Sequence, residues 1–487
     1  MLNEQEQKKS GEELIEEGNK LFKQSKFQLS VKSYSQAIQK SNGTSVRALL
    51  NRSAAYLKLE RFYLAYKDAQ LAAQLDVYNE KAYFRMGKAA YQMRQYEKAK
   101  NHFETCVELN QSVKEAEIEL KKSLQRIDES VTGIYDFESL VEQHMKRKNS
   151  NFDVADYKSN KIFITDIPNK SKGVLAIEAI KKGTLLVVSK AVKAAIYNEK
   201  SFEVNDFENF SKLITMMQSD PELAKQIYSL YAGPDYSRGE KFNELNVDVK
   251  HIESILKYNK FDIVNNIKLG EECDNESGLW LFPSYFNHSC APNTSTRFLG
   301  DLLIMYANQD IKKNEEVTTS YLCGGVNYDK RQEKLFKKYH FQCDCKLCIY
   351  DKNEPDLPKR ELLLNKIVSK FGNQSKQYTM AEINADINEL RKICLNRPNA
   401  SHFLGHPLII LGSLYESNHN FKNSAKAYEE AYFVSKEKDY MALLCLKKAS
   451  EAYKKCSNET RSKWCFQTAS EYYENNAALF KKLWDIY

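Results

Sequence analysis

Small and aromatic residues recur along the first 110 residues of the chain at matching offsets. Each copy starts with a small residue, has an aromatic residue nine positions later, and places three further recurring residues after it. The copies follow one another with a period of 34 to 35 residues. Their positions are Gly18, Phe27, Ser30, Tyr34 and Ala37, then Ser53, Phe62, Ala65, Ala69 and Ala72, then Gly87, Tyr96, Ala99, Phe103 and Cys106.

Such a period is typical of the tetratricopeptide repeat, in which small residues let two antiparallel helices approach closely and aromatic residues fill the space between neighbouring pairs. The same offsets return near the C-terminus, at Gly412, Phe421, Ser424, Tyr428 and Ala431, with a looser copy between Ser450 and Ala469. We therefore expect two helical arrays. Simple helix packing without any ligand is the alternative interpretation of both.

Between the arrays the pattern changes to short apolar runs punctuated by glycine and lysine pairs, as in "KIFITDIPNKSKGVLAIEAIKKGTLLVV" from Lys161, which indicates strands and hairpins. The sequence thus predicts an α+β multidomain protein. Its expected parts are a repeat domain at 1–128, a linker with a helix at 129–160, a β-rich domain at 161–342 with a helical insert at about 202–258, a cysteine-rich segment at 343–358, and a second helical domain at 359–487.

Composition narrows the class of protein. The 487 residues carry a formal net charge of +7 that is spread along the chain, which argues against direct nucleic-acid binding and allows an acidic or mixed protein partner. No apolar run approaches the ~20 residues of a membrane helix, and "MLNEQEQKKS" at the N-terminus lacks the apolar core of a signal peptide. We expect a cytoplasmic protein without a membrane partner, with the nucleus as an additional location.

The 11 cysteines are unlike a disulfide framework in a reducing compartment, so a tight cluster among them indicates metal. Cys343, Cys345 and Cys348 provide three thiolates within six residues, one ligand short of tetrahedral zinc. From spacing alone the fourth ligand stays open among Cys290, Cys323, His288 and His340. Cysteines elsewhere, such as Cys394 and Cys445, are more simply small buried residues.

Three motifs in order carry a resemblance to a known family: "NHSCAPNT" from Asn287, "IKKNEEVTTSYL" from Ile311, and "YHFQCDCKLC" from Tyr339. They resemble the SET domain and post-SET zinc site of protein lysine methyltransferases, most of all the SET-and-MYND (SMYD) family, over about 161–350. Repeats before and after this region are similar to features of that family. No cysteine lies between Cys106 and Cys273, so the MYND finger is absent and its functions are not carried over.

The resemblance implies a pseudoknot in which the NHSC segment and the strand ending in Tyr321 thread together and hold S-adenosyl-L-methionine. It also implies that Cys290 completes a Zn²⁺ site with Cys343, Cys345 and Cys348. At the SET start this chain has Ser171-Lys172-Gly173 where the family usually has Gly-x-Gly, and an exposed charged hairpin is the alternative for the two lysines there. The implied cofactor residues are Lys170, Lys172, Asn259, Ser284, Phe286, Asn287, His288, Tyr321 and Phe341.

By the same resemblance, Phe261, Tyr321 and Tyr339 would wall a narrow channel for the side chain of a lysine on a protein substrate. An apolar channel desolvates the amine and lowers its pKa, which favours the neutral nucleophile. Tyr321 would be the catalytic residue, because its hydroxyl orients the methyl group. The alternative interpretation of Phe261 and Tyr339 is that they are ordinary core aromatics.

The N-terminal repeats resemble domains that grip the C-terminal Glu-Glu-Val-Asp of heat-shock chaperones. Four of the five clamp positions match, at Asn19, Asn51, Lys81 and Arg85, whereas Ile15 stands where a lysine is usual. Lys81 and Arg85 lie one helical turn apart and can converge on a carboxylate. The alternatives are a solvated helix face and, for the whole chain, an inactive SET and repeat protein that acts as a chaperone adaptor.

Overall fold

The computed structural model describes residues 9–146, 151–168, 170–192, 197–198, 205–236, 247–263, 276–322, 328–372, 379–394, 401–434 and 440–470. The chain divides into two compact units. The first contains 1–135, 153–158 and 188–281, and the second contains 136–152, 159–187 and 282–487. Each unit is described by itself below. Among the described residues no helix is both long and apolar enough to cross a bilayer.

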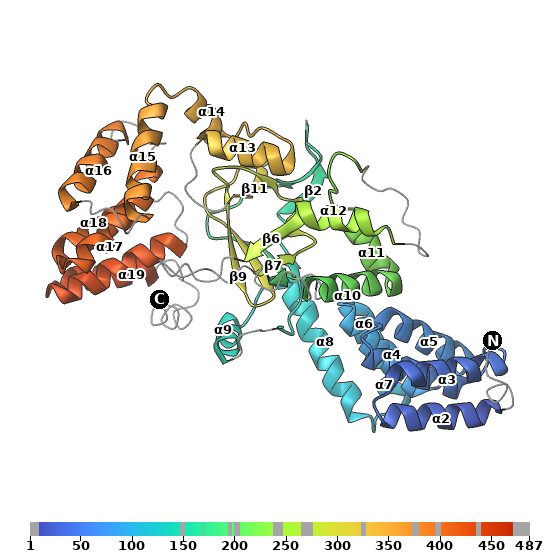
Figure 1. Cartoon of the computed structure of the whole chain (residues 1–487). Coiled ribbons are helices and arrows are strands. Elements are labelled where there is room, and N and C mark those ends of the chain that lie inside the picture. Colours follow the sequence, from blue (N-terminus) through green and yellow to red (C-terminus); the bar gives the residue numbers. More distant parts are fainter. Residues whose placement is uncertain are drawn as a thin grey trace. The chain divides into compact units, whose positions relative to one another are not determined.

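Helices dominate both ends of the chain (Figure 1). The first unit contains α2 (Gly11–Lys23), α3 (Phe27–Lys40), α4 (Val46–Lys58), α5 (Phe62–Leu75), α6 (Glu80–Gln92), α7 (Tyr96–Leu109), α8 (Lys114–Thr132), α10 (Asn205–Ser219), α11 (Pro221–Tyr228) and α12 (Val249–Asn259). The second contains α9 (Phe137–Lys146), α13 (Tyr328–Tyr339), α14 (Lys346–Lys352), α15 (Leu357–Gly372), α16 (Met380–Cys394), α17 (Gly405–Ser417), α18 (Phe421–Val434), α19 (Tyr440–Lys455), α20 (Glu459–Ser470) and the 3-10 turns η3 (Pro283–Tyr285) and η4 (Ser401–Leu404).

Short strands occupy the middle of the sequence, as expected. They are β1 (Tyr157–Lys158), β2 (Ile162–Asp166), β3 (Lys172–Ala176), β4 (Leu185–Lys190), β5 (Tyr197–Asn198), β6 (Lys260–Ile263), β7 (Glu276–Leu279), β8 (Asn287–His288), β9 (Thr294–Leu299), β10 (Leu302–Ala307) and β11 (Glu316–Thr319). In the first unit β5, β7 and β6 form one sheet. In the second, β9 pairs with β10, and another sheet has the order β2-β3-β11-β8. The predicted combination of helical arrays and a β-containing centre is confirmed.

The recurring small residues explain how the helix pairs pack. A Cβ atom on Gly18 would lie 2.4 Å from the Tyr34 ring, and one on Gly87 would lie 2.6 Å from the Phe103 ring. Gly412 has the same relation to Tyr428 in the second array, at 2.8 Å. Each glycine therefore lets the aromatic residue of the next helix lie directly against the backbone, which is the physical basis of the repeat period.

Helix α8 closes the first array and also holds the segment that follows it in the first unit. Glu129 accepts a hydrogen bond from the Ala155 backbone N–H at 2.9 Å, and the Tyr91 hydroxyl donates to Asp153 at 3.0 Å. Because α8 runs to Thr132, the predicted boundary at 128 falls inside this helix. A fragment ending there would lose the last turn of α8 and these contacts.

The second unit brings two distant motifs side by side. β8 runs parallel to β11, with Asn287 opposite Thr318 and His288 opposite Thr319, and the Ser289 N–H donates to the Thr319 carbonyl at 2.9 Å. The strands are separated by 27 residues in the sequence, and the β9–β10 hairpin lies between them. This parallel pairing is the close approach of the two motifs that the resemblance implied.

Candidate functional site

Asn293, at the end of the Asn-His-Ser-Cys motif, joins that motif to β11. Its Oδ1 accepts from the Thr318 N–H at 2.8 Å, and its Nδ2 donates to the Glu316 carbonyl at 2.8 Å. The side chain is buried, with 4% of its surface exposed. Sequence reasoning overlooked this residue, although it lies within the quoted motif. Its role follows from the requirement that buried backbone groups have partners.

We expect Asn293→Ala to loosen β11, because it leaves the Thr318 N–H and the Glu316 carbonyl buried without their partner. The free energy of local opening should fall by about 3 kcal/mol. Amide hydrogen exchange of the β11 peptide would then be about a hundredfold faster. Asn353→Ala is the control, since the Asn353 amide is exposed and donates to Ile349 on its own helix. Unchanged exchange in β11 would contradict this role for Asn293.

His288 sits where the two motifs meet. Its Nδ1 accepts a hydrogen bond from the Tyr321 backbone N–H at 2.9 Å, and its Nε2 lies 3.2 Å from the Cys290 Sγ. The side chain is buried, with 6% exposed. Both ring nitrogens thus have partners inside the fold. These contacts fix the orientation of the His288 ring between Tyr321 and Cys290.

Three aromatic rings gather beside His288. The Tyr321 and Tyr339 centroids are 4.9 Å apart, Tyr339 and Phe341 are 6.5 Å apart, and His288 is 5.2 Å from Tyr321 and 6.1 Å from Phe341. The Tyr321 hydroxyl donates to the Phe286 carbonyl at 2.8 Å. All three rings are only partly buried, so they form an aromatic wall with a solvent-accessible side.

Phe286, Ser284 and Asn287, which were also expected to contact the cofactor, differ in burial and in hydrogen bonding. The Phe286 side chain is core, with 1% exposed, and it packs edge-on to Phe282, so its carbonyl rather than its ring faces Tyr321. Ser284 is partly buried in η3. The Asn287 Nδ2 donates to the Lys172 carbonyl at 3.2 Å and to the Glu316 Oε1 at 2.8 Å.

The hairpin lysines each have an acidic partner. Lys170 Nζ lies 2.6 Å from Glu316 Oε2, and Lys172 Nζ lies 2.8 Å from Asp166 Oδ1. These pairs are exposed and so contribute little to stability. Gly173, between them and Asn287, has no room for a side chain, because a Cβ would lie 2.5 Å from the Asn287 Nδ2. A glycine is therefore required at position 173 of Ser171-Lys172-Gly173.

Asn259 and Phe261 belong to the first unit. The Asn259 amide donates to the Tyr231 carbonyl at 2.6 Å and to the Ile255 carbonyl at 2.7 Å, and the side chain is 6% exposed. Phe261 packs edge-on to the buried Trp280, with centroids 5.9 Å apart. In this unit both residues have the surroundings of structural residues, which was the alternative stated for Phe261.

Four cysteines come together in the second unit. The Sγ atoms of Cys290, Cys343, Cys345 and Cys348 all lie within 4.8 Å of one another. Four thiolates around tetrahedral zinc are separated by about 3.8 Å at the usual bond length, so the cluster fits this ion. His340 is exposed at a positive φ of 61°, and Cys323 lies outside the described residues. Hydrogen bonding with Cys290 lowers the pKa of both Cys343 and Cys345.

A buried charge network supports the cluster. Arg331 on α13 lies 3.9 Å from the Cys348 Sγ and 2.5 Å from Asp351, and Arg360 on α15 lies 2.6 Å from the other Asp351 oxygen. Asp351 is 0% exposed and Arg360 is 1% exposed. Two cations against one carboxylate leave a positive charge, which balances part of the negative charge of a four-thiolate metal site. Sequence spacing offered no signal for this network.

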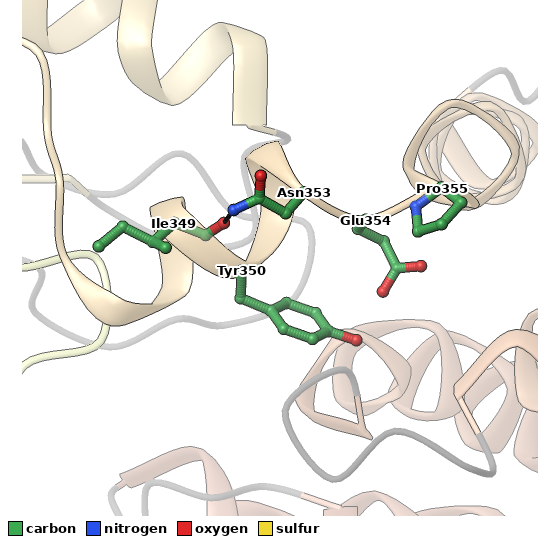
Figure 2. Close-up of a pocket in the computed structure, with 5 residues that line it drawn as sticks. All are labelled: Ile349, Tyr350, Asn353, Glu354 and Pro355. Atoms are coloured by element: carbon green, nitrogen blue, oxygen red, sulfur yellow. Dashed lines mark hydrogen bonds between the residues drawn. The ribbon is translucent and has the colours of Figure 1, made fainter.

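A cavity of about 460 Å³ lies next to helix α14, which carries Cys348, and is lined by Ile349, Tyr350, Asn353, Glu354 and Pro355. Figure 2 shows Tyr350 and Glu354 extending to the same side of the chain. The Tyr350 hydroxyl is buried without a hydrogen-bond partner in the described structure. None of the predicted site residues lines this cavity.

The predicted clamp residues lie in the first array. The Asn19 Oδ1 accepts hydrogen bonds from the Tyr34 hydroxyl and the Asn51 amide, both at 2.9 Å. Lys81 is exposed, whereas the Arg85 Nη1 is buried and has no partner among the described residues. Burial lowers the pKa of Arg85 to about 10. Hydrogen bonds within the fold therefore hold Asn19 and Asn51, and Arg85 carries an unsatisfied donor.

The fifth clamp position, Ile15, belongs to the core of the array, where it is 4% exposed. The nearby cation Arg47 forms ion pairs with Glu12 and Glu16. Ile15 therefore cannot supply the charge of the missing lysine, and Arg47 is already paired with two glutamates. This region carries less positive charge than a complete clamp would.

Comparison with known proteins gives two matches to families. A profile of the SET domain matches residues 171–322, and a tetratricopeptide repeat profile matches residues 80–112. The chain therefore contains a SET domain and a tetratricopeptide repeat.

Three curated relatives illustrate these parts. A "Methyltransferase" of Gibberella zeae is 25% identical over 378 residues, which cover 70% of this chain and 52% of that one. Human "Histone-lysine N-methyltransferase SMYD3" is 38% identical over 84 residues, 17% of this chain and 20% of that one. An "Hsp70-Hsp90 organizing protein" of Triticum aestivum is 31% identical over 138 residues, 28% and 24% of the two chains. The chain thus spans about half the length of the first relative and less of the others.

Proposed function

We propose that this protein is an S-adenosylmethionine-dependent protein-lysine N-methyltransferase that acts on a histone or non-histone lysine. The observation that carries the proposal is the meeting of three features within the second unit. The Asn-His-Ser-Cys motif, the aromatic wall of Tyr321, Tyr339 and Phe341, and the four-cysteine cluster are joined through His288. The SET profile and the methyltransferase relatives support the same reading.

The residues around Gly173 suit S-adenosylmethionine, which would supply an electrophilic methyl group. Asn287 donates its amide hydrogens within the fold, so its Oδ1 is the atom available to a donor such as the cofactor's ammonium. Lys170 and Lys172 sit in exposed ion pairs that can be exchanged for the cofactor carboxylate. The partly exposed ring of Phe341 offers a stacking surface for the adenine.

In the proposed reaction the chain binds a lysine side chain against the aromatic wall. Tyr321 and Tyr339 favour entry of the aliphatic stem and exclude water from the amine, which must be neutral to act as a nucleophile. The Tyr321 hydroxyl donates to the Phe286 carbonyl, which fixes its orientation, and its oxygen would orient the methyl group of a bound cofactor.

We propose Zn²⁺ as the ion of the four-cysteine cluster. Four sulfur ligands without an open position are typical of structural rather than catalytic zinc. The ion would link the loop at Cys290 to the segment at Cys343–Cys348. His288 lies two residues before Cys290 and Phe341 two residues before Cys343, so the ion would help to position both rings.

The direct test is mass spectrometry of a cell extract incubated with the purified protein and isotopically labelled cofactor. Labelled lysine in one or a few proteins supports the proposal. The proposal would be contradicted if the label were found only on other residue types. It would also be contradicted if the purified protein bound the cofactor but labelled no protein.

A second proposed function is the binding of a heat-shock chaperone C-terminus by the first array, in the cytoplasm. The observation favouring it is the buried Arg85 Nη1 without a partner, since an orphaned cation is suited to a carboxylate. Relatives with "Hsp70-Hsp90 organizing protein" in their names support the class of partner. If the SET region did not bind S-adenosylmethionine in a thermal-shift assay, the chain would be an adaptor only.

We expect Arg85→Met to weaken the binding of a peptide ending in Glu-Glu-Val-Asp about tenfold or more, because a charge-assisted hydrogen bond is lost. The unliganded protein should be no less stable, since a cation whose pKa is lowered by burial is costly in its charged form below about pH 10. Wild-type binding should correspondingly decline as the pH rises through about 10.

Fluorescence titration of the peptide against the full chain measures the affinity, because a fragment that ends at 128 would cut α8. Lys114→Met, at the exposed start of α8, is the charge control. With Ile15 in place of a cation, the wild-type affinity should be micromolar or weaker, on the order of −8 kcal/mol, and sensitive to salt. Equal affinity for the free-acid and amidated peptides would rule out a carboxylate clamp.

A further inference from the structure

Helix α8 carries an apolar stripe that its own unit covers only in part, since Leu120 packs against the core formed by α6 and α7 while Leu124 and Val131 are exposed. Leu120, Leu124, Ile127 and Val131 follow one another at alternating spacings of four, three and four residues. Leu124 is 45% exposed and Val131 is 72% exposed, while Leu120 and Ile127 are partly buried. This alternation is the spacing of a coiled-coil seam, which normally lies against another helix.

Another face of α8 already packs against neighbouring segments of the first unit. Ala116, Glu119, Ser123, Arg126 and Glu129 are buried on the adjoining face, where α8 packs on α7 and holds the segment at 153–156. A cavity of about 360 Å³ borders the stripe and is lined in part by Tyr96 of α7 and Ile127 of α8. The other lining residues are Arg94, Gln95, Glu97, Lys98, Ser130 and Asp156, so the stripe meets a hollow with a polar rim, and an apolar side chain of one more helix could enter beside Tyr96 and Ile127.

The charges beside the stripe indicate which helix. Lys121 and Asp128 are seven residues apart, both are exposed, and neither forms an ion pair in the described part of the chain. They occupy equivalent positions on one flank of the seam. Charges that repeat on one flank with opposite sign are self-complementary when two identical helices run antiparallel.

We propose that α8 is a self-association surface, on which a second copy of this chain docks its own α8 in the antiparallel direction. Leu120 then faces Val131 of the second copy and Leu124 faces Ile127, which places a leucine at the cavity beside Tyr96. In this register Lys121 of each copy faces Asp128 of the other. The two-fold symmetry gives two such pairs.

A parallel arrangement does not fit the same residues. There each flanking residue would face the opposite flank of the other helix, which in this chain carries Ser123 and Ser130. Neither serine offers a charge to Lys121 or Asp128. The antiparallel register is therefore the one that pairs both charges.

The seam is short, with four apolar residues from each chain, and it falls short of the ~1,200 Å² of buried surface that is usual in stable complexes. We expect association on the order of micromolar or weaker, decreasing with salt.

Sedimentation velocity of the full chain over a range of concentrations tests the proposal. Wild type should shift from monomer to dimer as the concentration rises, and Leu124→Glu should stay monomeric with an unchanged thermal midpoint. Lys121→Glu and Asp128→Lys should each weaken the dimer about tenfold, because two attractive pairs become repulsive. Mixing these two single variants, or combining both substitutions in one chain, should restore association.

A monomer at every soluble concentration would overturn the proposal. A dimer whose affinity did not change in Lys121→Glu and Asp128→Lys would also overturn it, because its interface would lie elsewhere. A fall in the thermal midpoint of Leu124→Glu without any change in mass would show that the stripe is covered within a single chain, and would overturn it as well.

Discussion

Replacing Cys345 with serine is expected to release the bound zinc and to abolish cofactor binding at the same time. A serine hydroxyl is a poor substitute for a thiolate ligand, and the three remaining sulfurs leave the site open. The four Sγ atoms lie within 4.8 Å of one another, so loss of the ion leaves like-charged or proton-sharing thiols crowded together. Cys290 and the segment carrying Phe341 would then separate.

The effect should extend beyond the metal. Arg331 lies against Cys348 and shares Asp351 with Arg360 of α15, so the charge balance of this buried network depends on the cluster. Leaving buried cations without sufficient negative charge costs several kcal/mol, roughly 3–5. We therefore expect faster hydrogen exchange in α13 and α15 of the variant, in addition to the loss of metal and cofactor.

Metal content by mass spectrometry and cofactor affinity by calorimetry measure the two effects separately. Wild type should carry about one zinc ion per chain. Cys456→Ser is the matched control, since the partly buried Cys456 lies outside the cluster and its thiol donates to the Tyr453 carbonyl, a hydrogen bond that a hydroxyl can also make. Normal cofactor affinity in metal-free Cys345→Ser would show that the zinc and cofactor sites are independent.

Tyr321→Phe is expected to cut methyl transfer about a hundredfold or more while leaving cofactor affinity nearly unchanged. The ring that packs against His288 and Tyr339 is retained, and only the hydroxyl is removed. That hydroxyl donates to the Phe286 carbonyl, so its loss should also lower stability by about 1 kcal/mol.

Single-turnover kinetics on a verified substrate separate the chemical step from binding. Tyr328→Phe is the control, because Tyr328 packs in the same cluster and loses only a hydroxyl. Its rate should stay within about twofold of wild type. If Tyr321→Phe turned over at the wild-type rate, another residue would have to orient the methyl group.

The four-cysteine cluster shows what could be predicted from sequence and what could not. Three crowded cysteines indicated a metal by their chemistry alone, whereas spacing left the fourth ligand open among four residues. Cys290 is 53 residues before Cys343 in the sequence, and no local rule connects them. The β8–β11 pairing brings the loop and the cysteine segment together, and that pairing is a tertiary contact.

Asn293 and Asp351 were overlooked for a related reason. Both are polar residues in segments that read as loops or surface helices, and their importance comes from being buried against backbone groups or arginines. Conversely, the resemblance indicated Phe286 as a cofactor contact, but its side chain lies in the core and only its carbonyl faces Tyr321.

The sequence by itself determined the helical arrays, because their packing depends on contacts between neighbouring helices. A glycine and the aromatic residue sixteen positions later, such as Gly18 and Tyr34, specify the closest approach within one helix pair, and the period then repeats it. It also indicated a metal site at Cys343, Cys345 and Cys348, which the fold brings together with Cys290.

Tertiary structure alone decided which distant residues act together. His288 lies between Cys290 and the Tyr321 backbone, and Arg331 joins the cysteine cluster to Arg360 through Asp351. It also decided that Arg85 is buried with an unpaired donor and that one face of α8 is left apolar and exposed. The physical reason is that burial, and the partners it supplies or withholds, arises from contacts between segments far apart in the chain.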